Sequence, residues 1–354
     1  MAYRSGKERN PVMKHLAPLS LSSGQSLRRF LGVAAVTTLA SAAAAGTVGS
    51  VAWAGPAARP AAATSYSFRT LNNHHDLTFN QLLGINNEGL IAGYFGSGAK
   101  GHPNKGYRLS KPYSQGNYAS ENYPGSRQTQ VTGLNDTGTT VGFWSTQNKA
   151  SLANNNFGFY LRAGHFHEVN FPAQGTSSPP VDQLLGVNDS NVAVGFYVNA
   201  QGDSRGYTFN IKTGRYARVE LPGINNLGKG TSLTASAINN SGGVAGFYSL
   251  NGGTTKGFYK TSGGHVYKLT VKGASATTPF GVNDSGEVVG AYTTGTGSSA
   301  QSFGFTWTRA HGFQTVSDPH GIGSTLINGV NDRGDLVGFY TDSAGNTDGM
   351  RATP

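Results

Sequence analysis

His74, His75 and Asp76 form the tightest group of side chains with metal-ligating chemistry in this chain. Neighbouring residues of an extended segment point in opposite directions, so the two imidazoles would not reach one ion. His165 and His167 are spaced to share one face of a strand, but such a pair occurs only once. We therefore expect no metal site and no cofactor, with these histidines in a solvated loop and on an outer strand.

Side-chain oxygens suited to Ca²⁺ recur along the chain, because an Asn followed by Asp or Asn occurs at six regularly spaced places. The pairs are Asn86-Asn87, Asn135-Asp136, Asn188-Asp189, Asn239-Asn240, Asn283-Asp284 and Asn331-Asp332. A calcium loop of the EF-hand kind needs Asp at alternate positions and a bidentate acid, whereas each pair supplies at most one carboxylate. Asn and Asp also favour tight turns, because they tolerate positive φ and make local hydrogen bonds. We interpret the pairs as structural turns.

These turns lie inside a repeated ten-residue phrase, of which residues 281–290 (GVNDSGEVVG) are a clear copy, and the shared Asn returns after 44 to 53 residues. An apolar run precedes each turn, and a second run contains a glycine seven residues after the Asn. A third segment begins with Gly and an aromatic residue in five copies, as in Gly206-Tyr207. A period near 50 that is rich in glycine, aromatic and β-branched residues predicts four-stranded propeller blades. We expect the recurring glycine to mark close backbone approach to a neighbouring blade.

The two ends of the repeat region predict how the ring is completed. The sixth repeat stops at Pro354, after its third strand, and so lacks a fourth. An unassigned strand over residues 65–71 stands where a fourth strand would precede the first repeat. A closed ring removes exposed sheet edges. The sequence therefore predicts an all-β fold: a six-bladed β-propeller of four-stranded antiparallel blades, closed by an N-terminal strand that completes the last blade.

The predicted ring would place uncharged polar side chains around the mouth of its central channel. Five repeats carry Gln or Thr five residues before the shared Asn, and the sixth carries Leu326. Together with adjacent residues, the candidate ligand-binding set is Asn80, Gln81, Gln130, Asp182, Gln183, Thr234 and Thr278. Uncharged donors and acceptors suit a neutral glycan or a peptide better than a phosphate. The alternative interpretation is that these side chains merely solvate the channel mouth.

The phrase at residues 281–290, followed by a Gly-aromatic strand, resembles the bacterial extracellular HAF-repeat family. That family is named for a His-Ala-Phe triplet on the third strand, where this chain has Lys-Gly-Tyr, Phe-Gly-Phe or Arg-Gly-Tyr instead. The resemblance covers roughly residues 66–353. It implies secretion and a repeat propeller, and it carries neither an established activity nor catalytic residues.

Residues 1–54 have the features of an export signal. Arg28-Arg29 precede a mildly apolar run over residues 30–51, and Ala52-Trp53-Ala54 matches a signal-peptide cleavage pattern. Paired arginines are typical of twin-arginine (Tat) export, and the general secretory (Sec) route stays open. Ala, Gly and Thr make the apolar run a poor membrane span. We predict a removed signal peptide over residues 1–54, a Pro/Ala linker over 55–64 and the propeller over 65–354.

Composition narrows the class of partner. The chain has no Cys, so disulfides and thiolate metal sites are excluded. Half of its formal net charge of +10 lies in residues 1–54, and no Lys/Arg cluster with interleaved aromatics follows, which argues against nucleic acid. The acidic residues sit mostly in turns and outer strands, which provides poorly for two-carboxylate glycosidase chemistry.

The sequence thus predicts a secreted, monomeric, non-catalytic propeller. Its expected function is to bind an extracellular protein, peptide or neutral glycan at the channel mouth. The alternative is an extracellular carbohydrate-active enzyme, a lyase or glycosidase, with its site at the same mouth. An enzyme would require at least two converging ionisable groups with perturbed pKa values.

Overall fold

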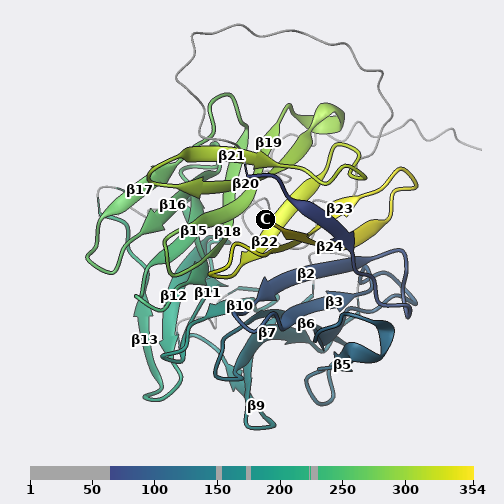
Figure 1. Ribbon diagram of the computed structural model, residues 1–354. Helices are drawn as coiled ribbons and strands as arrows, with labels where there is room; N and C mark the ends of the chain where they lie inside the picture. Colours follow the sequence, from purple (N-terminus) through teal and green to yellow (C-terminus); the bar gives the residue numbers. More distant parts are fainter. Residues whose placement is uncertain (1–63, 149–153, 173–176, 223, 225–229) are drawn as a thin grey trace, which may run out of the picture.

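The computed structural model describes residues 64–148, 154–172, 177–222, 224 and 230–354. They form six four-stranded antiparallel sheets arranged as blades around a central axis (Figure 1). The six-bladed β-propeller that the repeats predict is thereby confirmed. The predicted signal peptide and nearly all of the predicted linker lie outside the described residues.

Each blade has four strands. Blade 1 contains β2 (Asn80–Ile85), β3 (Ile91–Phe95), β4 (Lys105–Leu109) and β5 (Tyr118–Ser120). Blade 2 contains β6 (Gln128–Leu134), β7 (Thr140–Ser145), β8 (Phe157–Arg162) and β9 (His165–Val169). Blade 3 contains β10 (Asp182–Val187), β11 (Val192–Val198), β12 (Ser204–Asn210) and β13 (Arg215–Arg218). Blade 4 contains β14 (Ser232–Ile238), β15 (Val244–Ser249), β16 (Lys256–Lys260) and β17 (Val266–Leu269). Blade 5 contains β18 (Ala276–Val282), β19 (Val288–Thr294), β20 (Gln301–Thr308) and β21 (Gly312–Val316).

Blade 6 takes its strands from both ends of the described chain. It contains β22 (Thr325–Val330), β23 (Leu336–Thr341), β24 (Thr347–Thr353) and, as its outer strand, β1 (Ser67–Thr70). β1 pairs antiparallel with β24, and Figure 1 draws this purple strand beside the yellow end of the chain. The Thr70 hydroxyl also lies 2.8 Å from the Tyr340 hydroxyl in β23. The first and last described segments therefore share one sheet.

The Gly-aromatic pair on the third strand of blades 1 to 5, which is Gly349-Met350 in blade 6, packs toward both neighbouring blades. The aromatic side chain is fully buried, as at Phe159, Tyr207 and Phe258. The glycine faces the next blade so closely that a Cβ on Gly206 would lie 2.3 Å from Leu233 Cδ2. The aromatic residue must fill its space in the core, whereas any side chain in place of the glycine would collide with the next blade. These two requirements explain why the pair recurs.

The glycine seven residues after the shared Asn makes its close approach within its own blade, so the prediction of a neighbouring-blade contact is wrong. A Cβ on Gly195 would lie only 1.9 Å from the carbonyl oxygen of Gln183, on the adjacent strand β10. The register of β10 against β11 shifts between Leu184 and Gly186, and all six blades have such a bulge at this place. The bulge crowds the backbones of the paired strands locally.

A different glycine, two residues before the shared Asn, makes the contact between blades. A Cβ on Gly133 would lie 3.0 Å from the Cα of Gly186, and one on Gly329 would lie 3.1 Å from the Cα of Gly84. The second of these contacts joins blade 6 to blade 1. The innermost strands are therefore packed backbone to backbone where the blades meet.

The shared Asn side chains link the six blades in a continuous hydrogen-bonded ring. In each blade Oδ1 accepts the main-chain N–H four residues later at 2.7–3.0 Å, which fixes the turn. Nδ2 donates at 2.8–3.2 Å to the main-chain oxygen of the Asn in the following blade, and the last donor, Asn331, bonds Asn86. Six buried amides thus satisfy their own turn and the next blade together.

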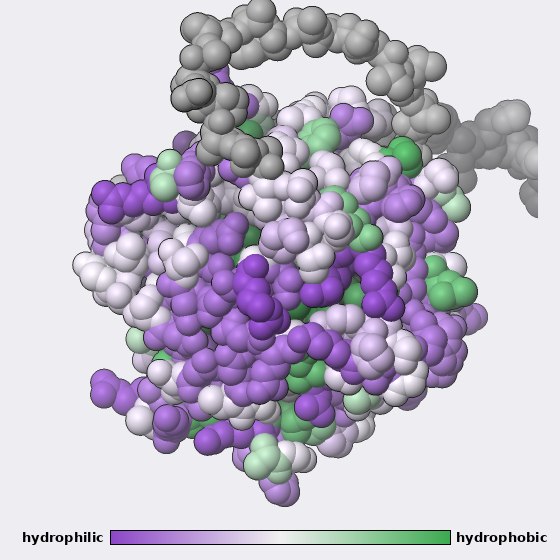
Figure 2. Space-filling view, in the orientation of Figure 1, coloured by the Kyte–Doolittle hydropathy of each residue, from purple (hydrophilic) through white to green (hydrophobic). Residues whose placement is uncertain are grey.

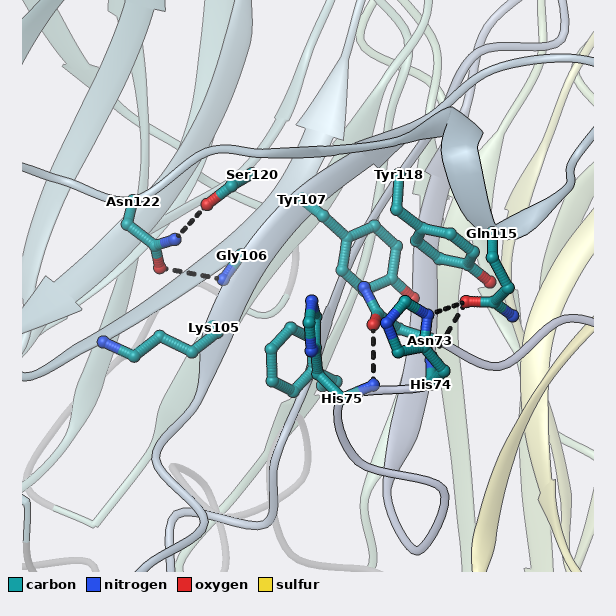
Figure 3. A pocket seen from close by; sticks show the side chains of 11 residues that line it. Asn73, His74, His75, Lys105, Gly106, Tyr107, Gln115, Tyr118, Ser120 and Asn122 are labelled. Atoms are coloured by element: carbon teal, nitrogen blue, oxygen red, sulfur yellow. Dashed lines mark hydrogen bonds between the residues drawn. The ribbon is translucent and has the colours of Figure 1, made fainter.

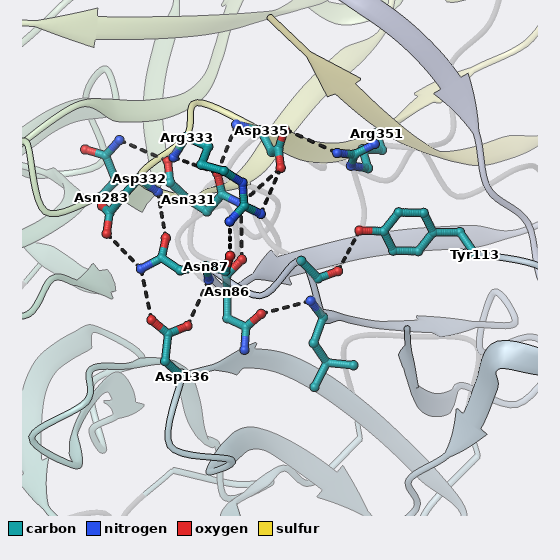
Figure 4. Close-up of polar contacts among 12 residues, drawn as sticks. Asn86, Asn87, Tyr113, Asp136, Asn283, Asn331, Asp332, Arg333, Asp335 and Arg351 are labelled. Carbon is teal, nitrogen blue, oxygen red and sulfur yellow. Dashed lines mark hydrogen bonds and ion pairs between the residues drawn. The ribbon is translucent and has the colours of Figure 1, made fainter. Parts of the chain in front are cut away.

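The residue after each shared Asn forms a second ring (Figure 4). Its main-chain N–H donates at 2.7–2.9 Å to the side-chain oxygen of its counterpart in the next blade, in all six blades. Asn87 sits between two carboxylates and donates to both Asp136 and Asp332, as Figure 4 shows. Asn240 does the same for Asp189 and Asp284. These bonds confirm the interpretation of the Asn-Asp pairs as structural turns.

Candidate functional site

The seven residues predicted to line the channel mouth are all buried, with exposures of 0% to 5%. Asn80 accepts the N–H of Asn73 and donates to the carbonyl of Asp76, so its side chain holds the segment that enters blade 1. Gln81 accepts a hydrogen bond from the Tyr94 hydroxyl, and Thr278 donates to the carbonyl of Ala291. These side chains have structural partners, and their binding of a ligand stays a prediction.

Two of the predicted glutamines bridge neighbouring blades. Gln130 donates to Asn104 of the preceding blade at 3.0 Å, and Gln183 donates to Asn156 of the preceding blade at 2.6 Å. The Oε1 atoms of both glutamines are buried without a hydrogen-bond partner. The NH₂ group of each glutamine thus bonds a neighbouring blade, whereas its oxygen stays unpaired. These side chains therefore do more than solvate the channel mouth.

Asp182 is the one titratable residue of the predicted set. It accepts the Tyr207 hydroxyl at 2.5 Å and the N–H of Phe171 at 2.7 Å. Burial raises the pKa of the Asp182 carboxyl to about 7, although both hydrogen bonds lower it in part. The raised pKa comes from enclosure at the junction of blades 2 and 3.

Asp182→Asn is expected to remove a pH dependence of stability. In the unfolded chain the carboxyl titrates near its ordinary pKa of 3.8, so between that pH and about 7 only the folded protein keeps the proton. The free energy of unfolding of the wild type should therefore fall as the pH rises through this window, by a few kcal/mol at most. Urea unfolding at pH values across the window should show this fall in the wild type and a flatter profile in the variant. Equal slopes for the two proteins would contradict the assignment to Asp182.

The histidine cluster does not converge on one ion. His74 bonds Gln115 through its ring and main chain, whereas Asp76 pairs with His102, Nδ1 to Oδ2, at 2.7 Å. Within the described ranges, no three His, Asp or Glu side chains lie together in an arrangement that could hold a metal ion. His165 and His167 are exposed on β9, as their outer-strand position predicts.

His74 and His75 instead lie at a pocket of about 200 Å³ in blade 1, which the sequence did not indicate (Figure 3). The pocket lies on the face of blade 1 that turns toward blade 6, beneath the segment that joins the two blades. Its polar lining includes Asn73, Gln115, Ser120 and Asn122. The lining also includes His74, His75 and Lys105, and in Figure 3 the Lys105 side chain extends away from the aromatic rings.

Three aromatic side chains form the wall of this pocket. Phe95 and Tyr107 lie nearly parallel, with ring centroids 6.5 Å apart and planes at 18°. Tyr118 meets Tyr107 edge to face at 4.9 Å. The His75 ring lies 5.8 Å from Phe95 at the rim. Aromatic faces beside a few placed polar groups are typical of small-molecule sites.

The hydroxyls of Tyr107 and Tyr118 are buried and have no hydrogen-bond partner. Burial raises the pKa of each phenol above its ordinary value, so both remain protonated and able to donate. The equivalent Tyr207 in blade 3 has Asp182 as its acceptor, but blade 1 has Asn80 there, whose oxygen and amide already have partners. An unpaired buried hydroxyl is costly, and both of these lie behind the aromatic wall with almost no exposed surface.

The visible face of the molecule is mainly hydrophilic, with hydrophobic residues in small separate patches (Figure 2). The exposed large hydrophobic residues of the described part are Leu77, Leu250 and Ile322. No helix in that part is long and apolar enough to cross a membrane.

The fold and these contacts define the class of protein as a six-bladed β-propeller. No family model matches the chain, and no curated protein matches it either. Among solved structures it is similar to SapL1 lectin in complex with alpha methyl fucoside, at a TM-score of 0.50 and 11% identity over 78% of this chain and 95% of that chain. It is also similar to AofleA from Arthrobotrys oligospora, at a TM-score of 0.49 and 12% identity over 82% and 86%. At these identities the likeness concerns the fold alone.

Proposed function

We propose that the protein is a non-catalytic module that binds a neutral glycan through the blade 1 pocket. The observation that carries this proposal is the pocket itself, with its aromatic wall and its polar lining of amide and hydroxyl side chains beside two histidines. A sugar ring offers apolar C–H faces to aromatic rings and hydroxyls that both donate and accept hydrogen bonds.

The pocket suits a neutral ligand better than an anion. Its polar lining holds the amides of Asn73, Gln115 and Asn122, the Ser120 hydroxyl and two imidazoles, and the Lys105 side chain is turned away from the rings. The predicted ring at the channel mouth is less suitable, because those side chains are buried and engaged in bonds between and within blades. We therefore assign the glycan to the blade 1 pocket, and we assign a structural function to the predicted residues at the channel mouth.

The remaining sequence predictions are part of this proposal. We propose that the chain is a secreted member of the HAF-repeat family, exported by the Tat or Sec route and active outside the cell as a monomer. The fold shared with SapL1 lectin, solved with alpha methyl fucoside, is compatible with a glycan-binding propeller.

A glycan array probed with the purified protein is expected to show binding to neutral oligosaccharides. A peptide array probed in parallel separates the two ligand classes, and incubation with the bound glycans followed by mass spectrometry tests for cleavage. Binding to neutral glycans without cleavage would support the proposal. Selective capture of peptides would contradict the glycan assignment, and glycan cleavage would contradict the non-catalytic one.

A further inference from the structure

We infer that blade 1 holds a single site for one neutral sugar ring, and that Asn73 keeps this site open. The inference rests on the proposed function and specifies its site, its ligand and its valency. It comes from comparing equivalent residues of the blades within this one chain.

The segments that enter the blades share one structurally equivalent position. The main-chain N–H groups of Leu71, Glu121 and Val219 donate to the carbonyl oxygens of Gly349, Gly106 and Gly206, so these three places are structurally equivalent. Two residues further on lies what we call the cover position, which faces the outer sheet of the blade being entered. For blades 1 to 4 its occupants are Asn73, Tyr123, Phe171 and Leu221.

In blades 2 and 3 an aromatic ring fills the space at the cover position. Tyr123 stacks on Trp144 with centroids 4.4 Å apart and planes at 3°. Phe171 stacks on Tyr197 at 4.5 Å and 7°, and also lies 5.2 Å from Tyr207. In blade 4 the aliphatic Leu221 is only 1% exposed and belongs to that blade's core. These blades are closed by a large apolar side chain.

Blade 1 has aromatic residues at the same three places as blades 2 and 3, but its cover position holds no large side chain. Phe95, Tyr107 and Tyr118 occupy the places of Tyr197, Tyr207 and Tyr216 in their sheets. Asn73 cannot fill the volume of a Tyr or Phe, and its own oxygen accepts the N–H of His75. The pocket of about 200 Å³ lies where blades 2, 3 and 4 carry the covering side chain. The corresponding residues of blades 5 and 6 are Val271 and Asp318, but blade 6 has Met350 in the place of Tyr107 and so lacks the three-ring wall of blade 1.

The size and chemistry of this space set its ligand class. About 200 Å³ is below the range of roughly 300–1,000 Å³ usual for drug-sized ligands, which favours one terminal sugar ring over an extended chain. A ring stacked on Phe95 would take the place of the covering side chain. The hydroxyls of Tyr107 and Tyr118 expose almost no surface, so the polar contacts of the sugar would come from other side chains of the lining, such as Ser120 and Asn122.

Titration calorimetry with neutral methyl pyranosides, taken from the sugars that bind on the array, tests this inference on the full chain. We expect one bound sugar per chain in the wild type. Asn73→Phe should bring the covering ring of blade 3 to blade 1 and lower the affinity at least a hundredfold. The variant should keep the wild-type melting temperature, because blades 2 and 3 show that the fold accepts an aromatic residue there.

A matched pair of milder variants keeps the test informative if Asn73→Phe fails to fold. Phe95→Leu removes the aromatic face on which the sugar would stack and should weaken binding about tenfold, equal to about 1.4 kcal/mol. Tyr197→Leu makes a similar change at the equivalent place in blade 3, which Phe171 covers, and should leave the affinity unchanged.

The outcomes distinguish this inference from the proposed function. If the wild type binds neutral sugars and both Asn73→Phe and Phe95→Leu bind equally well, the sugar lies elsewhere and only this inference is overturned. A stoichiometry of several sugars per chain would likewise overturn the single site. Preference for acidic over neutral sugars would overturn the ligand class, and absence of any sugar binding by the wild type would overturn both proposals.

Discussion

Gly195→Ala is expected to abolish stable folding, although it adds only one methyl group. That carbon would lie 1.9 Å from the carbonyl oxygen of Gln183, and both atoms belong to paired strands of one sheet. No side-chain rotation relieves a clash between two backbones, so β10 and β11 must separate and lose hydrogen bonds of their ladder. We expect a loss of several kcal/mol, a large part of the roughly 5–15 kcal/mol that holds a typical domain folded. Circular dichroism during heating and the soluble yield measure the effect.

Gly116→Ala is the matched control for this variant. Nothing lies within 4 Å of a Cβ built on Gly116, which sits in the short 3₁₀ helix Gln115–Asn117. Its melting temperature should equal that of the wild type. If Gly195→Ala melts within a few degrees of Gly116→Ala, a Cβ at residue 195 does not clash with the Gln183 carbonyl as proposed.

Removal of β1 is expected to have the second largest effect. β1 covers the edge of β24 and brings Phe68 against the core of blade 6. Arg69 and Thr70 add contacts to Tyr113 and Tyr340. A chain that begins at Leu71 should melt about 10 °C or more below one that begins at Thr64, since a domain of this size shifts roughly 2–4 °C per kcal/mol. The uncovered edge of β24 should also promote self-association.

A peptide added in trans tests whether strand pairing explains that loss. A synthetic peptide of residues 64–70 should raise the melting temperature of the shortened chain and suppress its association in analytical ultracentrifugation. A peptide with the same composition in scrambled order serves as the control. Equal melting temperatures for the two chain lengths would show that β1 contributes little to the ring.

The fold was predictable because each repeat carries the same local instructions. The shared Asn turn and the glycine seven residues later recur in all six copies, and the Gly-aromatic pair recurs in five. The partner of that recurring glycine was not predictable, because the bulge that brings the Gln183 carbonyl toward Gly195 leaves no mark in the hydrophobic pattern. The two hydrogen-bonded rings were not predicted either. Their signal was an Asn at one place in all six copies, followed in each copy by Asp or Asn.

The candidate site was much less predictable than the fold. A search for similar residues at equivalent places led to the Gln and Thr ring, whose side chains turned out to be buried. The pocket arises from the opposite kind of signal, a departure from the repeat. Asn73 stands where blades 2 to 4 have Tyr123, Phe171 and Leu221, and this contrast becomes visible only when the segments between blades are aligned by their hydrogen bonds.

The ring of shared Asn residues has a consequence for how such a chain can diversify. Each Asn bonds the main-chain oxygen of the next blade, an acceptor that every residue type provides. This contact therefore makes no demand on the neighbour's side chains and tolerates sequence change in the next blade. Specific fit between blades is left to the other contacts, such as Gln130 with Asn104 and Gln183 with Asn156.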